Sequence, residues 1–250
     1  MNRIALVTGG CGPLGSVLCR RLAADGANVI AADLPDAVDR WHPQDAIAAV
    51  SVDLTRPGDL DHLVATIERE HGRLDVLVHN AAFTGTSSLR GWAVPFAEQS
   101  DEAFDAAVEL NLSVPFRLTR RALPLLHAGS DAVIVNIASI YGLVGPDLRL
   151  YEGTSMGNPA GYAAAKGGLI QLTRYLAAVL APQVRVNAVA PGGLARGQDP
   201  QFVARYEERT PLRRMGTEDD VAGTVAWLAS NEARYVTGLV LAVDGGWTAR

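Results

Sequence analysis

Short apolar runs alternate with longer segments of mixed polarity along the whole chain. Most of the short runs are apolar without interruption and rich in valine, isoleucine and alanine, which is typical of parallel strands buried on both faces. The pattern predicts strands at 3–8, 28–33, 47–53, 74–80, 132–139, 184–190 and 239–243.

In the longer segments, apolar positions recur at helical spacing. Pro115 and Pro124 fall inside one of these segments, so we expect that helix to kink or to end early. Alternating strands and helices indicate βαβ units, so the pattern predicts an α/β fold with a doubly wound, Rossmann-type parallel sheet of about seven strands. Such sheets bind ligands at the carboxyl ends of their strands. The predicted helices are at 14–25, 57–71, 101–128, 160–181, 200–209 and 217–230.

Nothing in the pattern divides the chain, so we expect residues 1–250 to form one domain. Hydrophobic residues make up 48% of the chain and charged residues 20%, which is ordinary for a soluble protein. The net charge is −5 and the basic residues are scattered, which argues against nucleic acid or an anionic membrane as a partner. Without a signal-peptide pattern or a membrane-spanning apolar run, the sequence predicts a cytoplasmic protein. Cys11 and Cys19 lack metal-ligand or redox spacing, so we expect no metal site and no disulfide.

The stretch TGGCGPLG follows the first predicted strand and opens the first predicted helix. Gly10, Gly12 and Gly15 fit the GxGxxG pattern of dinucleotide-binding turns, in which glycines admit the pyrophosphate and the helix N-terminus offers free N–H groups to it. A tight turn without a ligand is the alternative. Pro13 falls near the first helical position, where a missing N–H is tolerated. We therefore expect Gly12, not residue 13, to admit the pyrophosphate.

Asp33 closes the second predicted strand, eighteen positions after Gly15. A carboxylate at this place meets the adenosine ribose hydroxyls of a bound dinucleotide and repels a 2′-phosphate. No arginine or lysine adjoins Asp33 or lies in the glycine loop. The sequence therefore favours NAD over NADP.

The stretch GYAAAKGGL places Tyr162 and Lys166 four residues apart, on one face of a predicted helix. A phenol with an ordinary pKa of about 10 is a poor base near neutral pH, but a neighbouring ammonium group favours the phenolate. The preceding predicted strand ends at Ser139, so its hydroxyl is expected to reach the same cleft.

Together these motifs resemble those of short-chain dehydrogenases/reductases of the single-domain kind. The resemblance covers nearly the whole chain, and the order and spacing of the motifs make it specific. The segments that carry it are TGGCGPLG, VDL at 52–54, HNAA at 79–82, LN at 110–111, NIAS at 136–139, YAAAK at 162–166, RVNAVAPGG at 185–193 and VTGLVLAVDGGW at 236–247.

The resemblance implies an enzyme that interconverts a secondary alcohol and a ketone by hydride transfer. Tyr162 would be the general acid/base, and Lys166 would lower its pKa and hold the nicotinamide ribose. Ser139 would hydrogen-bond the substrate oxygen, and Asn111 would anchor a water that links Lys166 to solvent. The implied cofactor-binding residues are Gly9, Gly12, Pro13, Leu14, Asp33, Asp53, Leu54, Asn80, Ala81, Tyr162, Lys166, Pro191, Gly192 and Leu194.

Three features depart from the family pattern. The usual Asn-Ala-Gly reads NAA, which places Ala82 near the cofactor, and the threonine that often follows PGG is replaced in the segment 194–196. An insertion at 145–159 also separates Ser139 from Tyr162, and at the mouth of the cleft it should shape substrate choice. The polar residues that we expect to contact a substrate are Arg149, Glu152, Ser155 and Arg196.

The region around the insertion resembles a narrower subgroup that is linked to surface-sugar and flagellin-glycan biosynthesis, which implies a nucleotide-sugar or polyol substrate. A 3-oxoacyl-(acyl-carrier-protein) reductase, a simple alcohol dehydrogenase and a non-catalytic dinucleotide-binding regulator are the alternatives. GTSMG around Ser155 matches a hydrolase nucleophile elbow, but Pro159 disfavours the helix that an elbow needs. The family's usual assembly implies a homotetramer or homodimer formed through the helices at 101–128 and 160–181 and the last strand.

Overall fold

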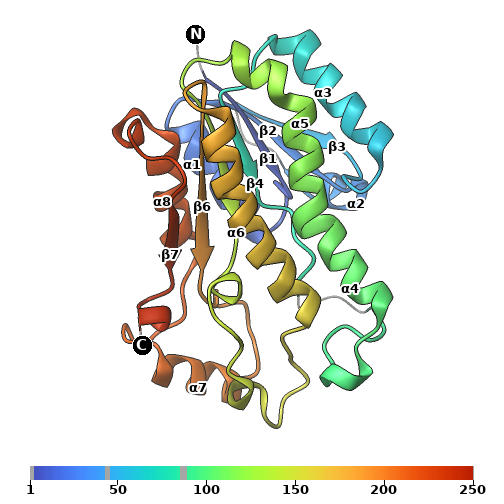
Figure 1. Ribbon diagram of the computed structural model, residues 1–250, viewed down its shortest axis with the longest axis vertical. Helices are drawn as coiled ribbons and strands as arrows, with labels where there is room; N and C mark the ends of the chain where they lie inside the picture. Colours follow the sequence, from blue (N-terminus) through green and yellow to red (C-terminus); the bar gives the residue numbers. More distant parts are fainter. Residues whose placement is uncertain (1–2, 43–45, 85–88, 250) are drawn as a thin grey trace.

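The computed structural model describes residues 3–42, 46–84 and 89–249. In these residues seven parallel strands form one sheet in the order β3-β2-β1-β4-β5-β6-β7, which confirms the predicted Rossmann-type α/β fold (Figure 1). The chain starts at the centre of the sheet, winds outward to β3 and then returns to place β4 on the other side of β1. Ligands bind parallel sheets at such a reversal of strand order.

All seven strands coincide with predicted ones to within two residues at either end. They are β1 Ile4–Thr8, β2 Asn28–Asp33, β3 Ile47–Ser51, β4 Val76–His79, β5 Ala132–Ile137, β6 Val184–Pro191 and β7 Val240–Val243.

The helices differ from the prediction at one long segment. The helix predicted at 101–128 is interrupted, but upstream of both prolines, by a π-helical turn at Glu109–Ser113. Pro115 lies in the first turn of the following helix, where its missing N–H is not needed, and Pro124 lies inside that helix without ending it. The helices are α1 Pro13–Ala24, α2 Pro35–Asp39, which was not predicted, α3 Pro57–His71, α4 Asp101–Val108, α5 Val114–Ala128, α6 Ala160–Leu180, α7 Pro200–Arg209 and α8 Glu218–Ala229.

Two apolar cores lie on opposite faces of the sheet. Helices α3, α5 and α6 cover one face, and α1 and α8 cover the other (Figure 1). Neighbouring residues of one strand enter different cores, since Leu6 of β1 belongs to the first and Val7 to the second. Every residue of β1 is buried, which explains why the central strands are continuously apolar in sequence.

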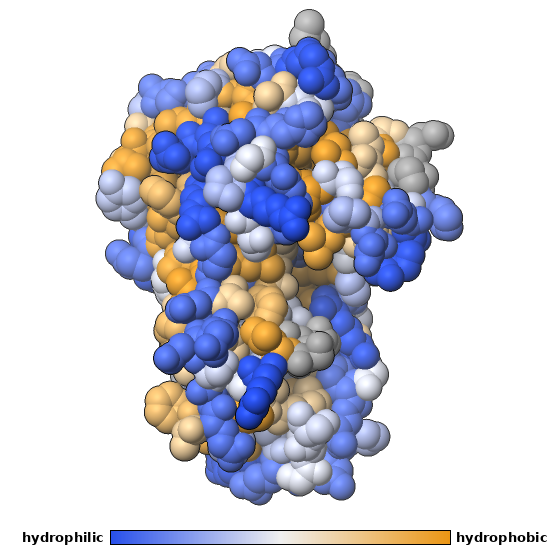
Figure 2. All heavy atoms as spheres, turned by 90° about the vertical axis from the view of Figure 1, so that its right-hand side faces the viewer, coloured by the Kyte–Doolittle hydropathy of each residue, from blue (hydrophilic) through white to orange (hydrophobic). Residues whose placement is uncertain are grey.

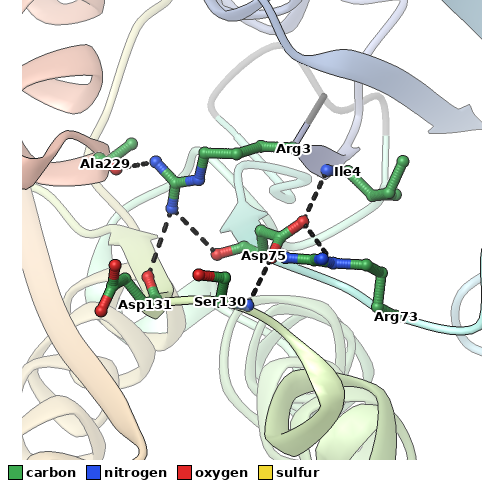
Figure 3. Close-up of polar contacts among 7 residues, drawn as sticks. All are labelled: Arg3, Ile4, Arg73, Asp75, Ser130, Asp131 and Ala229. Carbon is green, nitrogen blue, oxygen red and sulfur yellow. Dashed lines mark hydrogen bonds and ion pairs between the residues drawn. The ribbon is translucent and has the colours of Figure 1, made fainter. Parts of the chain in front are cut away.

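A buried carboxylate organises the amino end of the sheet (Figure 3). Asp75 precedes β4 and accepts hydrogen bonds from the backbone N–H groups of Ile4 (2.8 Å) and Ser130 (2.7 Å). Arg73 forms an ion pair with it, and the Arg3 guanidinium donates to the carbonyl oxygens of Asp75 and Asp131. Burial raises the pKa of Asp75, but the hydrogen bonds from Arg73 and the two N–H groups outweigh it and hold the pKa below 3.8. These contacts join β1, β4 and the start of β5.

We expect Asp75→Asn to lower the free energy of unfolding by about 2–4 kcal/mol, because a neutral amide at this fully buried position cannot accept all the hydrogen bonds of the carboxylate and leaves Arg73 without its charge partner. The native pKa lies below the unfolded value of 3.8, so the stabilisation is present above that pH and is lost as the pH falls through the native pKa. Urea denaturation at pH 7 and pH 3 measures both effects.

The control is Asp61→Asn, which removes an ion pair with Arg121 whose acidic partner is exposed. That change should cost at most about 1 kcal/mol. Equal losses for the two variants would contradict the role given to Asp75.

Candidate active site

The carboxyl ends of the strands carry most of the residues that the sequence singled out. The β6 arrow in Figure 1 points to the lower end of the molecule, where α7 and the C-terminus lie. The segment between β5 and α6 also extends to this end and contributes a 3₁₀ turn at Leu148–Tyr151. The candidate site therefore lies at the end of the sheet opposite to Asp75.

In the glycine loop between β1 and α1, the packing of the chain itself requires Gly9, Gly10 and Gly15 but not Gly12. A Cβ on Gly15 would lie 1.9 Å from the carbonyl oxygen of Gly9, whereas a Cβ on Gly12 would lie 3.4 Å from that atom. Pro13 is the first residue of α1, as predicted, and Gly12 is an N-cap without a side-chain hydrogen bond. The first-turn N–H groups, beginning with that of Leu14, are left for another partner.

The end of β4 holds this loop in place. The hydroxyl of Thr8 accepts the backbone N–H groups of Asn80 (3.0 Å) and Ala81 (3.1 Å). The side-chain amide of Asn80 donates to the carbonyl oxygens of Thr8 and Gly9, both at 3.0 Å. Asn80 and Ala81 thus lie directly beside the glycine loop, as their predicted cofactor contacts require.

Asp33 reaches the same loop from the end of β2. Its Oδ2 accepts the backbone N–H of Cys11 at 3.0 Å, and its Oδ1 accepts that of Leu34 at 2.9 Å. The carboxylate is partly exposed and keeps lone pairs for a ligand.

Asp53 and Leu54 lie after β3 and are engaged by the protein. Oδ1 of Asp53 accepts the hydroxyl of Thr55 at 2.7 Å, and Oδ2 is paired with Arg56 at 3.1 Å. The Leu54 side chain is buried in the core beneath α3. The carboxylate of Asp53 therefore holds the turn into α3.

Helix α6 brings Tyr162 and Lys166 against the end of β5. The Lys166 amine is buried and donates to the carbonyl oxygen of Ile137 at 2.7 Å, two residues before Ser139. It lies 5.7 Å from the centre of the Tyr162 ring. Ser139 is itself buried and lies near enough to the Tyr162 phenol to lower its pKa. Three predicted catalytic side chains therefore converge at one place.

Burial dominates the ionisation of this group. It lowers the pKa of Lys166 to about 7. It also raises the pKa of Tyr162, while the nearby Ser139 hydroxyl and the charge of Arg196 act in the opposite direction. The resemblance assigned the lowering of the phenol pKa to Lys166; in the structure, Ser139 and Arg196 favour the phenolate most.

Asn111 lies at the centre of the π-helical turn and is buried. Its Oδ1 accepts the backbone N–H of Phe83 at 2.8 Å, and its Nδ2 donates to the carbonyl oxygen of Phe83 at 3.1 Å. The side chain therefore ties α4 and α5 to the segment after β4. The water that the resemblance implies here would have to bind a remaining lone pair of Asn111 or a backbone carbonyl oxygen of the widened turn.

The segment after β6 is held by Tyr206 of α7. The Tyr206 hydroxyl accepts the backbone N–H of Gly193 at 2.6 Å, and a Cβ on Gly192 would lie 2.7 Å from that hydroxyl oxygen. Pro191 is the buried last residue of β6, and Leu194 forms a β-bridge with Gly216. The predicted cofactor residues of this segment thus follow β6 directly into the site.

The insertion at 145–159 is fastened to α7. Asp147 is paired with Arg149 and with Arg209 of α7, each at 2.7 Å. Arg205 of α7 donates to the carbonyl oxygens of Arg149, Leu150 and Glu152. The insertion and α7 therefore form one connected wall.

The polar residues predicted on this wall have different surroundings. Arg149, Glu152 and Ser155 are exposed, whereas Arg196 is paired with Glu218 at 2.9 Å and acts on Tyr162 electrostatically. No strand leads to Ser155 among the described residues, so GTSMG is not a nucleophile elbow.

Three polar side chains of this region, those of Tyr141, Tyr151 and Asn158, were not predicted to bind a ligand. The hydroxyls of Tyr141 and Tyr151 lie 2.6 Å apart. Both amide atoms of Asn158 are buried without a hydrogen-bond partner, four residues before Tyr162. The contact between the tyrosines depends on how the insertion folds back, for which the sequence carries no periodic signal.

Known proteins share this architecture and these motifs. A family model described as "Enoyl-(Acyl carrier protein) reductase" matches residues 13–248. The chain is 31% identical to 7alpha-hydroxysteroid dehydrogenase from Bacteroides fragilis, over 99% of this chain and 95% of that protein. The chain belongs to the short-chain dehydrogenase/reductase family. It is thus an oxidoreductase that acts on CH–OH groups and binds a nicotinamide dinucleotide.

Two further short-chain dehydrogenases/reductases show how far the likeness extends. The crystal structure of a short chain dehydrogenase from Leptospira borgpetersenii with bound NAD+ matches with a TM-score of 0.88 at 32% identity, over 99% of this chain and 93% of that one. The uncharacterized short-chain type dehydrogenase/reductase y4vI of Sinorhizobium fredii is 34% identical over 98% of this chain, which spans 44% of that protein's length.

Among the described residues, no three or more His, Cys, Asp and Glu side chains gather so that they could hold a metal ion. No helix in residues 3–42, 46–84 or 89–249 combines the length and apolarity needed to cross a membrane.

Lys166 is the only lysine of the chain. Its burial should make the free energy of unfolding of this short-chain dehydrogenase lower at neutral pH than at high pH. The unfolded chain holds this proton up to about pH 10.5, whereas the folded chain releases it near pH 7. Between these values the unfolded state binds more protons, so the free energy of unfolding rises with pH. We expect Lys166→Met to raise the free energy of unfolding by about 1–4 kcal/mol at pH 7 and to abolish its rise with pH above neutrality.

Chemical denaturation at pH 7 and pH 9.5 measures both quantities. The control is Arg174→Met, which removes an exposed cation from the same helix and should change stability little at either pH. A Lys166→Met variant that is less stable than the parent at pH 7, with an unchanged pH dependence, would show that the amine is charged and well satisfied in the folded protein.

Proposed function

We propose that this enzyme interconverts a secondary alcohol and a ketone with NAD(H), with Tyr162 as the general acid/base. The observation that carries the proposal is the convergence of Ser139, Tyr162 and Lys166 at the carboxyl end of β5. Tyr162 would exchange the proton of the substrate hydroxyl, and Ser139 would hydrogen-bond the same oxygen and orient it. Asn111 and the π-helical turn would hold the water that connects Lys166 to solvent.

The glycine loop fits a dinucleotide. Gly12 has room for a Cβ within the protein, so close approach of a ligand explains the glycine better than packing does. The uncapped first turn of α1 would bind the pyrophosphate through its N–H groups. When bound, the nicotinamide ring accepts or supplies the hydride. The residues that would hold the cofactor are Gly9, Gly12, Pro13, Leu14, Asp33, Asp53, Leu54, Asn80, Ala81, Tyr162, Lys166, Pro191, Gly192 and Leu194.

The carboxylate of Asp33 supports NAD rather than NADP as this cofactor. It is anchored beside the glycine loop by the N–H of Cys11, and a 2′-phosphate would meet its negative charge. Asp33→Asn keeps an acceptor for the N–H but removes the charge. We expect this variant to lower the ratio of the NADPH to the NADH dissociation constant about tenfold.

Fluorescence titration with both cofactors measures this ratio. The control is Asp36→Asn, an exposed carboxylate in α2. A ratio that stays the same in Asp33→Asn, or falls equally in the control, would contradict the assignment.

Removal of the Tyr162 hydroxyl tests the proton transfer. We expect Tyr162→Phe to reduce turnover of cyclohexane-1,2-diol with NAD about 10²- to 10⁴-fold, because the proton has lost its acceptor. The NADH dissociation constant should stay unchanged, since the ring remains in place. Undiminished turnover would exclude Tyr162 as the acid/base, and lost NADH binding would show that the change disturbs the cofactor site.

For the substrate we propose a polyhydroxylated alcohol. Three arginines near the cleft have acidic partners, Arg149 and Arg209 with Asp147 and Arg196 with Glu218, and Arg205 is engaged by backbone carbonyl oxygens. An acyl-carrier protein or a sugar diphosphate would draw on unpaired cations, whereas a neutral polyol needs only hydrogen-bonding groups. This pairing favours a polyol over a nucleotide-sugar and over a 3-oxoacyl-(acyl-carrier-protein) substrate.

We also propose that the enzyme forms a homodimer or homotetramer through α4, α5 and α6. Phe104, Phe116, Tyr175 and Val179 of these helices expose large apolar side chains. A hollow of about 390 Å³ lies between α5 and α6, lined by Leu112 and Leu172 among others. Apolar side chains also reach the surface between charged ones on the side that Figure 2 shows. A second copy would cover this apolar surface.

A further inference from the structure

Two tyrosine hydroxyls meet beside the candidate catalytic group. The hydroxyl oxygens of Tyr141 and Tyr151 lie 2.6 Å apart, which is hydrogen-bond distance. Tyr141 follows Ser139 by two residues, and its backbone N–H donates to Oγ of Ser139 at 3.2 Å. Tyr151 comes from the insertion, which thus places a phenol next to the residue that follows Ser139 by two positions. We call the two side chains the phenol pair.

The phenol pair lies within electrostatic range of Tyr162. A negative charge on Tyr162 would raise the pKa of Tyr141 and of Tyr151, so both phenols are within electrostatic range of the proposed acid/base. Burial raises the pKa of both, that of Tyr151 to about 12. The pair is therefore neutral at physiological pH, and it acts on a ligand through hydrogen bonds rather than through charge.

The insertion does not need these hydroxyls to stay in place. Arg205 and Arg209 of α7 already hold it, through backbone carbonyls and through Asp147. The rings also pack well, with Tyr151 at 5.3 Å from Phe202 and Tyr141 at 6.4 Å from Trp247 between ring centres. Phenylalanine would keep both ring contacts. Two hydroxyls placed in an apolar cluster call for another explanation.

The phenol pair has more hydrogen-bonding groups than its own contact uses. Each phenol has one O–H donor and two lone pairs. In the pair one hydroxyl donates to the other, so one proton and several lone pairs remain unused. A partly buried hydroxyl with an unused donor loses free energy unless a ligand or water satisfies it. One oxygen atom of a ligand would satisfy it.

We propose that Tyr141 and Tyr151 together bind a second oxygen of the substrate, a hydroxyl or carbonyl near the carbon that reacts. The enzyme would then select diols and hydroxy ketones over simple alcohols, because a site built to bond a hydroxyl binds an analogue without it poorly. The inference rests on the proposed oxidation of a secondary alcohol and names the residues that recognise the rest of its substrate. Asn158, with its unpartnered buried amide, is a second polar group of the same segment.

The test compares matched substrates in matched variants. Cyclohexanol carries one hydroxyl, and cyclohexane-1,2-diol and cyclohexane-1,3-diol carry two on the same ring. We expect Tyr151→Phe and Tyr141→Phe to reduce kcat/KM for the preferred diol about tenfold, mainly through KM, and to leave cyclohexanol unchanged. The double variant should lose no more than either single one, because the two hydroxyls act as a unit. Tyr235→Phe, at a fully exposed tyrosine, is the control and should change neither substrate.

Binding to the NADH complex, measured by calorimetry with the same three compounds, separates this inference from the proposed function. If the parent enzyme turns over none of them with NAD, the proposed reaction fails for this substrate class, and the binding data still decide the inference. Tenfold weaker diol binding in Tyr151→Phe supports it. Equal losses for cyclohexanol and the diols, or a parent enzyme that binds the diols no better than cyclohexanol, would overturn it.

Discussion

The hydrogen bond from the Lys166 amine to the carbonyl oxygen of Ile137 fixes how α6 meets β5. Ser139 follows that carbonyl by two residues, and Tyr162 precedes the lysine by one helical turn, so this bond sets the position of both hydroxyls. The turn after Ser139 must pass very close to α6, since a Cβ on Gly142 would lie 2.8 Å from the backbone of Lys166. The buried amine therefore acts as a fixed point for the site, at the cost of its own desolvation.

The two ends of the sheet differ in how the protein treats a buried ionisable group. At the amino end, Asp75 has a partner for each oxygen, and its charge is stabilised. At the carboxyl end, Lys166 is held at a lowered pKa, and the buried amide of Asn158 has no partner. Unmet polar groups are costly in a folded protein and are retained where a ligand completes them. Because Arg3 Nε is also buried without a partner at the amino end, the lowered pKa of Lys166 distinguishes the binding end better than the unpartnered amide does.

Sequence patterns identify the strands and the catalytic motif because both depend on local regularities. Buried parallel strands are continuously apolar, and Tyr162 and Lys166 meet through helical spacing alone. The π-helical turn at Glu109–Ser113 was not predicted because the apolar positions on either side of it keep helical spacing. Pro115 and Pro124 instead suggested a break further along the chain. The contact of Tyr141 with Tyr151 was not predicted because the nine residues between them fold back without a periodic pattern.

The insertion gives this site a wall that the shared fold does not specify. Arg205 and Arg209 bind it to α7, and α7 in turn holds the segment after β6 through the bond from Gly193 to Tyr206. A change in the insertion is therefore transmitted to both sides of the cleft, to Tyr141 through the phenol pair and to the segment after β6 through α7. The insertion and the segment after β6 are thus physically connected, whereas the proposed catalytic side chains of Ser139, Tyr162 and Lys166 lie at the end of β5 and on α6.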